Sequence, residues 1–357
     1  MGLMAARDVA IKWNISQRRV AILCSEGRIA GAQRVSNMWV IPDDAEKPVD
    51  GRSLRYTKKK LITVKPFIKW AGGKGQLLTD IRKIYPDDLG KNIKKYAEPF
   101  VGGGAVLFDI LSTYELDEVF ICDINAKLMN TYRMIRDDVS GLLGLLFALQ
   151  DAYLPLDEDD RKLFYYKKRD RFNELKVNGD SMINLESAAL FIFLNRTCFN
   201  GLYRVNRKNL FNVPIGSYKK PLICDANNLR SISNVLKKVT IVSGDYKESA
   251  EFIDKHTFVY FDPPYRPLNL TSSFTAYTED EFDDGAQIEL AEYVQQLNDK
   301  GAFVVVSNSD PKNVNPNDNF FDELYSRQKV NRVVATRIIN SNADSRGKIR
   351  ELLICNY

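Results

Sequence analysis

The chain has 357 residues, of which 45 % are hydrophobic and 27 % charged, a composition typical of globular proteins with one large or two to three smaller domains. It contains no signal peptide and no apolar run near the ~20 residues of a membrane span, which predicts a cytoplasmic protein. Its five cysteines form no CxxC pair, which argues against a zinc site, and its single histidine argues against His-based acid–base catalysis.

The net charge of +5 is unevenly distributed, because the beginning of the chain is basic. Residues 1–41 contain six Arg or Lys against two Asp or Glu, and a second basic cluster follows at residues 52–69. Local basic surface of this kind indicates a polyanion partner, although a solvated surface can have the same composition.

The basic residues 1–41 are expected to form a small separate module. Ala5 to Trp13 has helical spacing, and Ser16 can cap a second helix that ends near Gly27. The stretch from Gly31 to Pro42 then predicts a short β-hairpin.

Arg18 and Arg19 lie in the first turn of the second helix, where a recognition helix meets base edges. The segment resembles winged helix-turn-helix modules of the excisionase and MerR type, and this resemblance implies DNA binding. A protein-docking or structural domain is the alternative. We place the module at residues 1–53 and a polar linker at residues 54–64.

From Pro66 onward, strands and helices alternate as in an α/β protein. A strand ending near Ala97, a helix from Ala105 to Leu111 and a strand from Glu118 to Cys122 predict a βαβ unit. Residues 127–235 are mostly helical and interrupt the alternation. Further strands are expected at 239–242, 258–261 and 302–306, with a terminal antiparallel pair at 332–339 and 351–356.

A glycine run, Gly102 to Gly104, follows a strand and opens a helix, so backbone can approach a ligand closely at a helix N-terminus. Asp123 lies 21 positions after Gly102 at the end of the next strand, which suits a carboxylate that grips ribose hydroxyls. The ligand should therefore contain a nucleoside, with NAD and S-adenosylmethionine as candidates. The run is not the spaced G-x-G-x-x-G of dinucleotide sites, and no catalytic histidine is available for hydride chemistry, so a methyl donor is favoured.

The tetrapeptide Asp262-Pro263-Pro264-Tyr265 follows a buried apolar run, at the strand end where open α/β sheets bind ligands. A carboxylate beside a proline-stiffened carbonyl offers two acceptors to a planar exocyclic amino group. The tyrosine ring can stack on the heterocycle that carries this group. Two acceptors draw the nitrogen toward tetrahedral geometry, and its lone pair becomes a nucleophile.

These motifs occur in a familiar order, at residues 67–74, 98–104, 123–125 and 262–265. The chain resembles the Dam family of DNA adenine-N6 methyltransferases in the α-type motif order, over roughly residues 65–357. The resemblance implies a Rossmann-like methyltransferase sheet that binds S-adenosylmethionine, with residues 127–235 as a mostly helical target-recognition insertion.

The resemblance also implies the cofactor contacts. Trp70 and Lys74 would line the methionine end of S-adenosylmethionine, and Phe100 would line its pocket. Asp123 would hold the ribose, and Asp245 would lie near the adenine. The full set implied for the cofactor is Trp70, Lys74, Phe100, Gly102, Gly104, Asp123, Asp245 and Asp262.

Residues 194–221 interleave Arg, Asn, Lys and aromatic side chains and are similar to the target-recognition β-hairpin of Dam-type enzymes that read GATC. Phe199 would be the intercalating ring, and Arg204 would read a guanine. The other residues implied to contact DNA are Lys69 at the first guanine, Asn200 and Leu202 at base edges, Pro214 at a thymine methyl, and Tyr218. Ser217 departs from the arginine of the best-known members, which puts phosphate or outer-base contacts in doubt.

The sequence therefore predicts transfer of a methyl group from S-adenosylmethionine to adenine N6 in double-stranded DNA, at GATC or a longer GAT-containing site. The target base would be flipped, and Asp262, Pro263, Pro264 and Tyr265 would be catalytic without a metal. We expect a monomer, and leave open whether a restriction endonuclease is its partner. The alternatives are a cytosine-N4 methyltransferase, which would more often carry Ser at the Asp262 position, an RNA or protein amino-group methyltransferase, and a non-enzymatic DNA-binding regulator.

Overall fold

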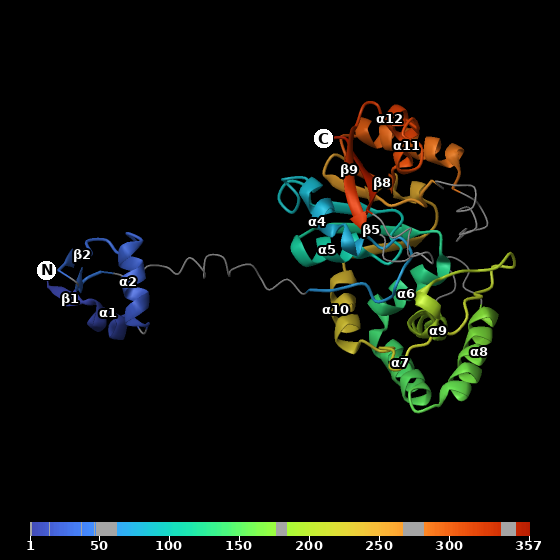
Figure 1. Cartoon of the computed structure of the whole chain (residues 1–357), viewed down its shortest axis with the longest axis horizontal. Coiled ribbons are helices and arrows are strands. Elements are labelled where there is room, and N and C mark those ends of the chain that lie inside the picture. Colours follow the sequence, from blue (N-terminus) through green and yellow to red (C-terminus); the bar gives the residue numbers. More distant parts are fainter. Residues whose placement is uncertain are drawn as a thin grey trace. The chain divides into compact units, whose positions relative to one another are not determined.

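The computed structural model describes residues 2–13, 15–36, 38–45, 47, 63–175, 184–266, 282–336 and 348–357. The chain divides into two units, residues 1–61 and 62–357 (Figure 1). Most of the linker predicted at 54–64 lies outside the described residues. Within the described ranges, no helix is long and apolar enough to cross a membrane.

The N-terminal unit contains two helices and a three-stranded antiparallel sheet of order β1-β3-β2. Its elements are β1 (Leu3–Ala5), α1 (Ala6–Trp13), α2 (Gln17–Ser25), β2 (Gln33–Val35) and β3 (Met38–Pro42). The predicted helices and hairpin are present, and Ser16 caps α2 by accepting a hydrogen bond from the Arg19 amide at 3.2 Å. The strand β1 was not predicted, because three residues are too few to show an alternating pattern.

The second unit is built on a seven-stranded sheet of order β6-β5-β4-β7-β8-β10-β9. Its strands are β4 (Lys95–Glu98), β5 (Glu118–Asp123), β6 (Val239–Ser243), β7 (Thr257–Phe261), β8 (Phe303–Ser309), β9 (Lys329–Thr336) and β10 (Lys348–Cys355). The strands β4 to β8 are parallel, and β10 runs antiparallel to β8 and β9. The predicted α/β class and terminal antiparallel pair are therefore confirmed within the described residues.

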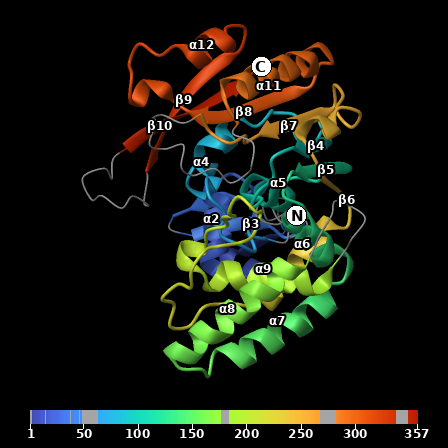
Figure 2. The ribbon, with the colours of Figure 1, turned by 90° about the vertical axis from the view of Figure 1, so that its right-hand side faces the viewer.

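The middle of this sheet is covered on both faces, which explains the apolar runs in β5, β7 and β8. In β5, Val119 and Ile121 belong to one hydrophobic core, and Phe120 and Cys122 belong to the other. The first core is shared with α5 (Ala105–Thr113) and α6 (Ala126–Asp137), and the second with α11 (Asp284–Asp299) and α12 (Phe320–Leu324). Figure 2 shows α11 and α12 on one side of the sheet and α4 (Leu78–Ile81) and α5 on the other.

A helical lobe lies beside the sheet and contains α7 (Val139–Tyr153), α8 (Glu158–Glu174), α9 (Leu185–Thr197) and α10 (Ala226–Leu236). The helix α6 packs against the sheet, because Arg133 and Arg136 donate to β6 carbonyl oxygens, each at 2.9 Å. The predicted helical insertion at 127–235 thus begins with a helix that covers the sheet.

The segment after α9 differs from the predicted β-hairpin. Its two limbs are joined by isolated antiparallel bridges, Cys198 with Ile215 and Val205 with Phe211, and not by continuous strands. A 3-10 turn at Phe199–Gly201 interrupts the first limb. Pro214, which has no N–H to donate, interrupts the second limb.

Candidate active site

The acidic motif residues gather at one edge of the sheet. Glu98, Asp123, Asp245 and Asp262 lie at or just after the ends of β4, β5, β6 and β7, which are parallel. From β4 the chain proceeds to β5 and β6 on one side, whereas β7 and β8 lie on the other. This reversal of strand order creates the crevice where open α/β sheets bind ligands.

The Asp262 carboxylate keeps one oxygen available at this crevice. Lys74 Nζ lies 2.7 Å from Oδ1, and Ser307 Oγ donates to the same Oδ1 at 2.8 Å. Among the described residues, no donor binds Asp262 Oδ2 or the Pro263 carbonyl oxygen. Two neighbouring acceptors, one charged and one neutral, can therefore receive the hydrogens of an exocyclic amino group.

The loop that carries these acceptors is held by buried amides. Gln287 Nε2 donates to the Pro264 carbonyl at 3.0 Å, and its Oε1 accepts from Asn308 Nδ2 at 3.0 Å. Asn308 Oδ1 in turn accepts from the Arg266 amide at 3.2 Å. Gln287 and Asn308 have no exposed surface, so these bonds are shielded from water.

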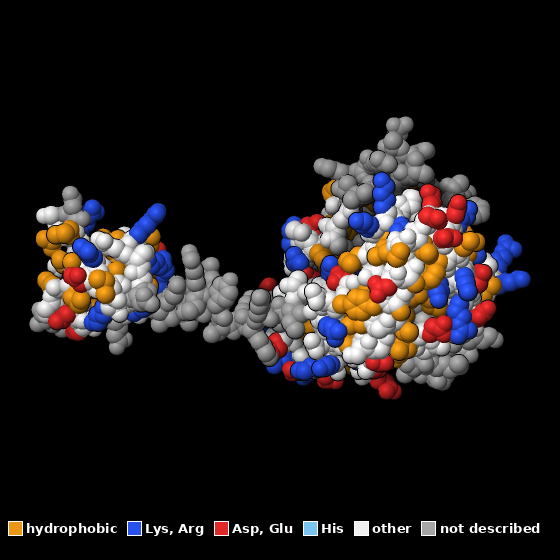
Figure 3. Space-filling view, turned by 90° about the horizontal axis from the view of Figure 1, so that it is seen from below, with side chains coloured by type: hydrophobic (Ala, Val, Ile, Leu, Met, Phe, Trp, Pro, Cys, Tyr) orange, Lys and Arg blue, Asp and Glu red, His pale blue; other side chains and the backbone are white. Residues whose placement is uncertain are grey.

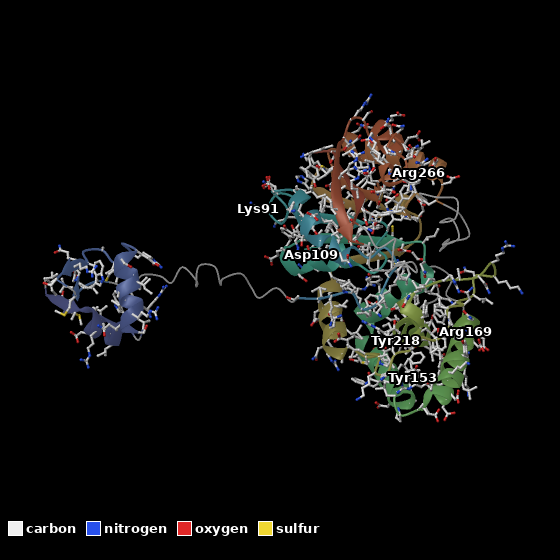
Figure 4. The ribbon with its side chains drawn as sticks, viewed as in Figure 1. Lys91, Asp109, Tyr153, Arg169, Tyr218 and Arg266 are labelled. Carbon is white, nitrogen blue, oxygen red and sulfur yellow. The ribbon has the colours of Figure 1, made fainter. Side chains whose placement is uncertain are left out.

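Further polar contacts hold Tyr265 and Arg266, the last two described residues before the gap at 267–281. Tyr265 Oη donates to Glu351 Oε2 at 2.7 Å. The Arg266 guanidinium binds the Asp284 carboxylate at 2.6 and 2.9 Å and Asp318 at 2.8 Å, on the α11 side of the sheet (Figure 4). A carboxylate and an aromatic ring are thus presented on a braced backbone, which favours positioning of a planar substrate.

Lys74, which the resemblance places at the methionine end of the cofactor, is paired with Asp262. Its side chain is 4 % exposed, and its Nζ donates to the Gly72 carbonyl at 2.7 Å besides pairing with Asp262. The same Nζ lies 4.6 Å from the centroid of the Tyr265 ring. Lys74 therefore holds a positive charge beside the Asp262 carboxylate.

The glycine turn after β4 approaches other protein groups so closely that side chains are excluded. Gly102 and Gly104 have φ values of 47° and 71°. A Cβ on Gly102 would lie 2.7 Å from Trp70 Cδ1, and one on Gly104 would lie 2.5 Å from Tyr132 Oη. The Gly102 amide donates to Asp123 and is therefore already engaged. The turn can let a ligand approach the backbone closely, but this amide does not point at it as a free donor.

Asp123 is fixed by two backbone amides. Its Oδ2 accepts from Gly102 at 3.0 Å, and its Oδ1 accepts from Asn125 at 2.9 Å. Burial raises the pKa of Asp123, while these two hydrogen bonds act in the opposite direction. A carboxylate has about four acceptor positions. Asp123 can therefore still accept hydrogen bonds from the two hydroxyls of a ribose, and these acceptors fit a nucleoside cofactor.

Aromatic rings line the other part of this crevice. Phe100 stacks on Tyr246 with centroids 5.4 Å apart, and Phe282 meets it edge-on at 5.8 Å. Asp245 precedes Tyr246, and its Oδ1 accepts from the Lys247 amide at 2.9 Å. An apolar wall with a carboxylate at its rim is suited to a purine.

Trp70 connects this region to the segment after α9. Its ring stacks on Tyr203 at 5.6 Å and on Phe191 at 6.3 Å. Tyr203 lies between Leu202 and Arg204, two of the residues implied to contact DNA. The structure therefore brings the motif at residues 67–74 into direct contact with the candidate recognition segment, residues 194–221.

The recognition segment presents its candidate DNA contacts to solvent. The Phe199 side chain is 51 % exposed, and Asn200, Arg204 and Pro214 are also exposed, with Leu202 half-buried. The Phe199 amide donates to the Pro214 carbonyl at 2.9 Å. Arg204 Nε donates to Asn212 Oδ1 at 2.9 Å, which holds the guanidinium. An exposed aromatic ring and an oriented arginine on the same segment suit, respectively, insertion into duplex DNA and contact with a base edge.

Lys69 and Tyr218 join this surface from distant parts of the sequence. Lys69 Nζ donates to Tyr218 Oη at 3.1 Å and lies 4.7 Å from the Tyr218 ring centroid. Figure 4 places Tyr218 in the helical lobe. Arg161 of α8 donates to the Tyr218 and Lys219 carbonyls at 3.5 and 2.9 Å, and so supports this end of the segment.

Arg18 and Arg19, the other two candidate DNA contacts, lie on α2 in the N-terminal unit. Arg18 is exposed, and Arg19 is half-buried. Figure 3 shows blue Lys and Arg side chains at several places on the surface of this unit.

Several residues of the site were not predicted from the sequence, namely Ser307, Gln287, Asn308 and Glu351. A signal existed for two of them, because the polar run Ser307 to Asp310 closes the otherwise apolar strand β8. Gln287 and Glu351 lie in a helix and a strand of ordinary pattern, so nothing in their local sequence distinguishes them.

Comparison with known proteins adds a family match. A model of D12 class N6 adenine-specific DNA methyltransferases matches residues 70–339, within the second unit. The Type II methyltransferase M.MjaIII of Methanocaldococcus jannaschii is 51 % identical over 298 residues, which is 83 % of this chain and 100 % of the relative. The Type II methyltransferase M1.LlaDCHI of Lactococcus lactis subsp. cremoris is 37 % identical over 302 residues, 84 % of this chain and 98 % of the relative. A DNA adenine methylase of Haemophilus influenzae is 34 % identical over 306 residues, 85 % of this chain and 97 % of the relative.

Proposed function

This chain belongs to the D12 class of N6 adenine-specific DNA methyltransferases, and on this premise we propose that it methylates the adenine of GATC in double-stranded DNA with S-adenosylmethionine as donor. The observation that carries the proposal is a pair of acceptors beside β4, Asp262 Oδ2 and the Pro263 carbonyl, to which no donor of the described residues is bound. They match the two hydrogens of an adenine amino group.

In the proposed reaction the protein positions and polarises the amino group. Asp262 and Pro263 each accept one N6 hydrogen, which draws the nitrogen lone pair out of conjugation with the purine ring. Tyr265, fixed by Glu351, orients the ring by stacking. S-adenosylmethionine supplies an electrophilic methyl group on a sulfonium and leaves as S-adenosylhomocysteine. The N6 nitrogen would form the new C–N bond as the bond between sulfur and the methyl carbon breaks, and the extra proton of the methylated nitrogen would pass to solvent. Positioning and electrostatics would supply most of the rate.

We assign the cofactor to the glycine turn and the aromatic wall. Asp123 would hold the ribose hydroxyls, since both its oxygens retain acceptor capacity. Phe100 would pack on the adenine, and Asp245 would accept from its amino group. Trp70 and the turn of Gly102 and Gly104 would limit the space beside the ribose and the adenine.

We assign GATC recognition to the exposed segment after α9 and to Lys69. Phe199 would fill the gap left by the flipped adenine, and Arg204 would bind a guanine. Lys69 would bind the first guanine beside Tyr218. Asn200, Leu202 and Pro214 would complete the contacts with base edges. The exposure of these side chains supports the assignment, while Ser217 leaves the outer positions of the site to experiment.

We also propose that the N-terminal unit is a winged helix-turn-helix that binds DNA through Arg18 and Arg19 of α2. Its two helices and hairpin, with a basic surface, support this assignment. Two of the relatives are named Type II methyltransferases, which supports a pairing with a restriction endonuclease that reads the same site.

The proposal is tested on unmethylated genomic DNA treated with the purified protein and S-adenosylmethionine. Sequencing that detects modified bases should find N6-methyladenine at GATC, and the DNA should become resistant to an endonuclease that cuts unmethylated GATC. Methylation confined to longer sites that begin with GAT would correct the recognition sequence. N4-methylcytosine as the product would refute the assigned target base.

A further inference from the structure

Asn195 forms three short hydrogen bonds that join two parts of the DNA-recognition surface. Its Oδ1 accepts from the Lys69 amide at 2.9 Å, and its Nδ2 donates to the Lys69 carbonyl at 2.8 Å. The same Nδ2 donates to the Gly201 carbonyl at 2.9 Å. Asn195 lies in the last turn of α9 and is 3 % exposed. These bonds are therefore buried and hard to replace with water.

The two partners of Asn195 also touch each other. Gly201 closes the turn that carries Phe199, and it has a φ of 66°. A Cβ on Gly201 would lie 2.5 Å from Lys69 Cδ and 2.8 Å from Lys69 Cβ. The stem of Lys69 thus packs on the Gly201 backbone, and its Nζ reaches Tyr218. The direction of the lysine is set by its backbone, by this close contact and by the tyrosine.

We propose that Asn195 is a specificity-determining positioning residue, which sets the place of Lys69 relative to the Phe199–Gly201 turn. The inference rests on the proposed function, in which Lys69 binds a base and Phe199 replaces the flipped adenine. A bidentate amide that binds both backbone groups of Lys69 fixes its Cα. The third bond transmits this position to the turn. Asn195 itself does not touch the substrate, so its effect is exerted through Lys69.

The chain contains a matched control for this arrangement. Asn228, in the first turn of α10, accepts from the Lys65 amide at 3.1 Å and donates to the Lys65 carbonyl at 2.9 Å. It is 7 % exposed and thus buried like Asn195. Asn228 holds the same segment four residues earlier. Its Nδ2 has no bond to the recognition turn.

The experiment compares Asn195→Asp with Asn228→Asp in the full chain. Each substitution keeps the side-chain oxygen that accepts from the lysine amide and replaces the donating NH2 by a second oxygen. In Asn195→Asp this oxygen faces the Lys69 and Gly201 carbonyls, and in Asn228→Asp it faces the Lys65 carbonyl. Initial rates are measured on a cognate duplex and on duplexes changed at one base pair each, and kcat/KM ratios give the discrimination at each position. Lys69→Ala, measured in parallel, identifies the base pair that Lys69 reads. Thermal unfolding reports the stability of every variant.

We expect Lys69→Ala and Asn195→Asp to relax discrimination at the same base pair, by about tenfold for a lost base contact. Asn228→Asp should lower thermal stability comparably but change discrimination by no more than about twofold, as expected for an independent site. Equal discrimination in the two Asn variants, or relaxation by Asn195→Asp at a base pair other than that of Lys69, would overturn the inference.

A second variant covers the case in which Asn195→Asp does not fold. In Gly201→Ala the added methyl group would collide with the Lys69 stem and displace it, while Asn195 is unchanged. It should relax the same base pair, and full discrimination in this variant would contradict the inference. The sites that the wild-type protein methylates show whether the proposed recognition sequence fails, and the Lys69→Ala variant shows whether the role of Asn195 fails. Methylation outside GATC corrects the proposed site, whereas a Lys69→Ala variant with unchanged discrimination removes the role of Lys69 and of Asn195 with it.

Discussion

Replacing Asp262 by Ala should remove methyl transfer and destabilise the protein for two separable reasons. The Lys74 side chain is 4 % exposed and that of Asp262 is 21 % exposed, with Nζ and Oδ1 2.7 Å apart. Removal of one partner from a buried ion pair costs roughly 3–5 kcal/mol. Lys74 keeps its bond to Gly72 and its position over the Tyr265 ring. We therefore expect the lower end of this range, about 3 kcal/mol.

The double variant Asp262→Ala with Lys74→Met distinguishes the two effects. Methionine removes the unpaired charge, so the free energy of unfolding should recover by about 2 kcal/mol relative to Asp262→Ala alone. Methyl transfer should not recover, because the acceptor for the amino group is still absent. By analogy with single groups that stabilise transition-state charge, the loss in kcat should be at least ~10²-fold in both variants.

Denaturant unfolding and single-turnover methyl transfer from labelled S-adenosylmethionine measure the two quantities. If Asp262→Ala retained methyl transfer within about tenfold of the wild type, well short of the loss expected for such a group, the catalytic assignment would be refuted. If the double variant were no more stable than the single variant, the ion pair would not be the source of the stability loss.

The remaining predictions concern base reading, the N-terminal unit and a buried acid. Arg204→Ala should cost roughly 1–3 kcal/mol of discrimination at one guanine, and a uniform loss across duplex sequences would make Arg204 a phosphate contact. Replacing Arg18 and Arg19 by Ala should make the plot of log binding constant against log salt concentration shallower by about 1–2, and an unchanged slope would place α2 away from DNA. Burial raises the pKa of Glu98 from 4.5 to about 8, so the folded protein holds a proton that the unfolded chain releases. Glu98 should then make the free energy of unfolding fall as the pH rises from 4.5 to about 8, by up to ~1.4 kcal/mol per pH unit. In denaturation experiments, the free energy of unfolding of Glu98→Gln should fall less steeply with pH than that of the wild type.

The arrangement of the crevice was predictable because it follows from strand ends. Asp123 and Asp262 each follow an apolar run, and parallel strands bring their carboxyl ends to one edge. Ser16 was recognisable as a cap because capping acts over three residues. These features depend on local spacing, which the sequence displays directly.

Contacts between distant residues were not predictable in this way. Asn195 and Lys69 are 126 positions apart, and neither has a local feature that indicates the other. The glycine run was interpreted as space for a ligand, whereas Gly102 and Gly103 are also required by the Trp70 ring. The ion pair between Lys74 and Asp262 was likewise not predicted, because the two residues are far apart in the sequence. These contacts depend on which side chains pack together in the folded chain, and the spacing of residues in the sequence does not determine this.

The most direct test of the account is methyl transfer from labelled S-adenosylmethionine to two duplexes, one with GATC and one with the same bases scrambled, followed by identification of the modified nucleoside by mass spectrometry. We predict N6-methyladenine in the GATC duplex alone. N6-methyladenine in neither duplex, together with its formation in bulk genomic DNA, would contradict GATC as the site, and a modified cytosine would contradict the assigned chemistry of Asp262 and Pro263.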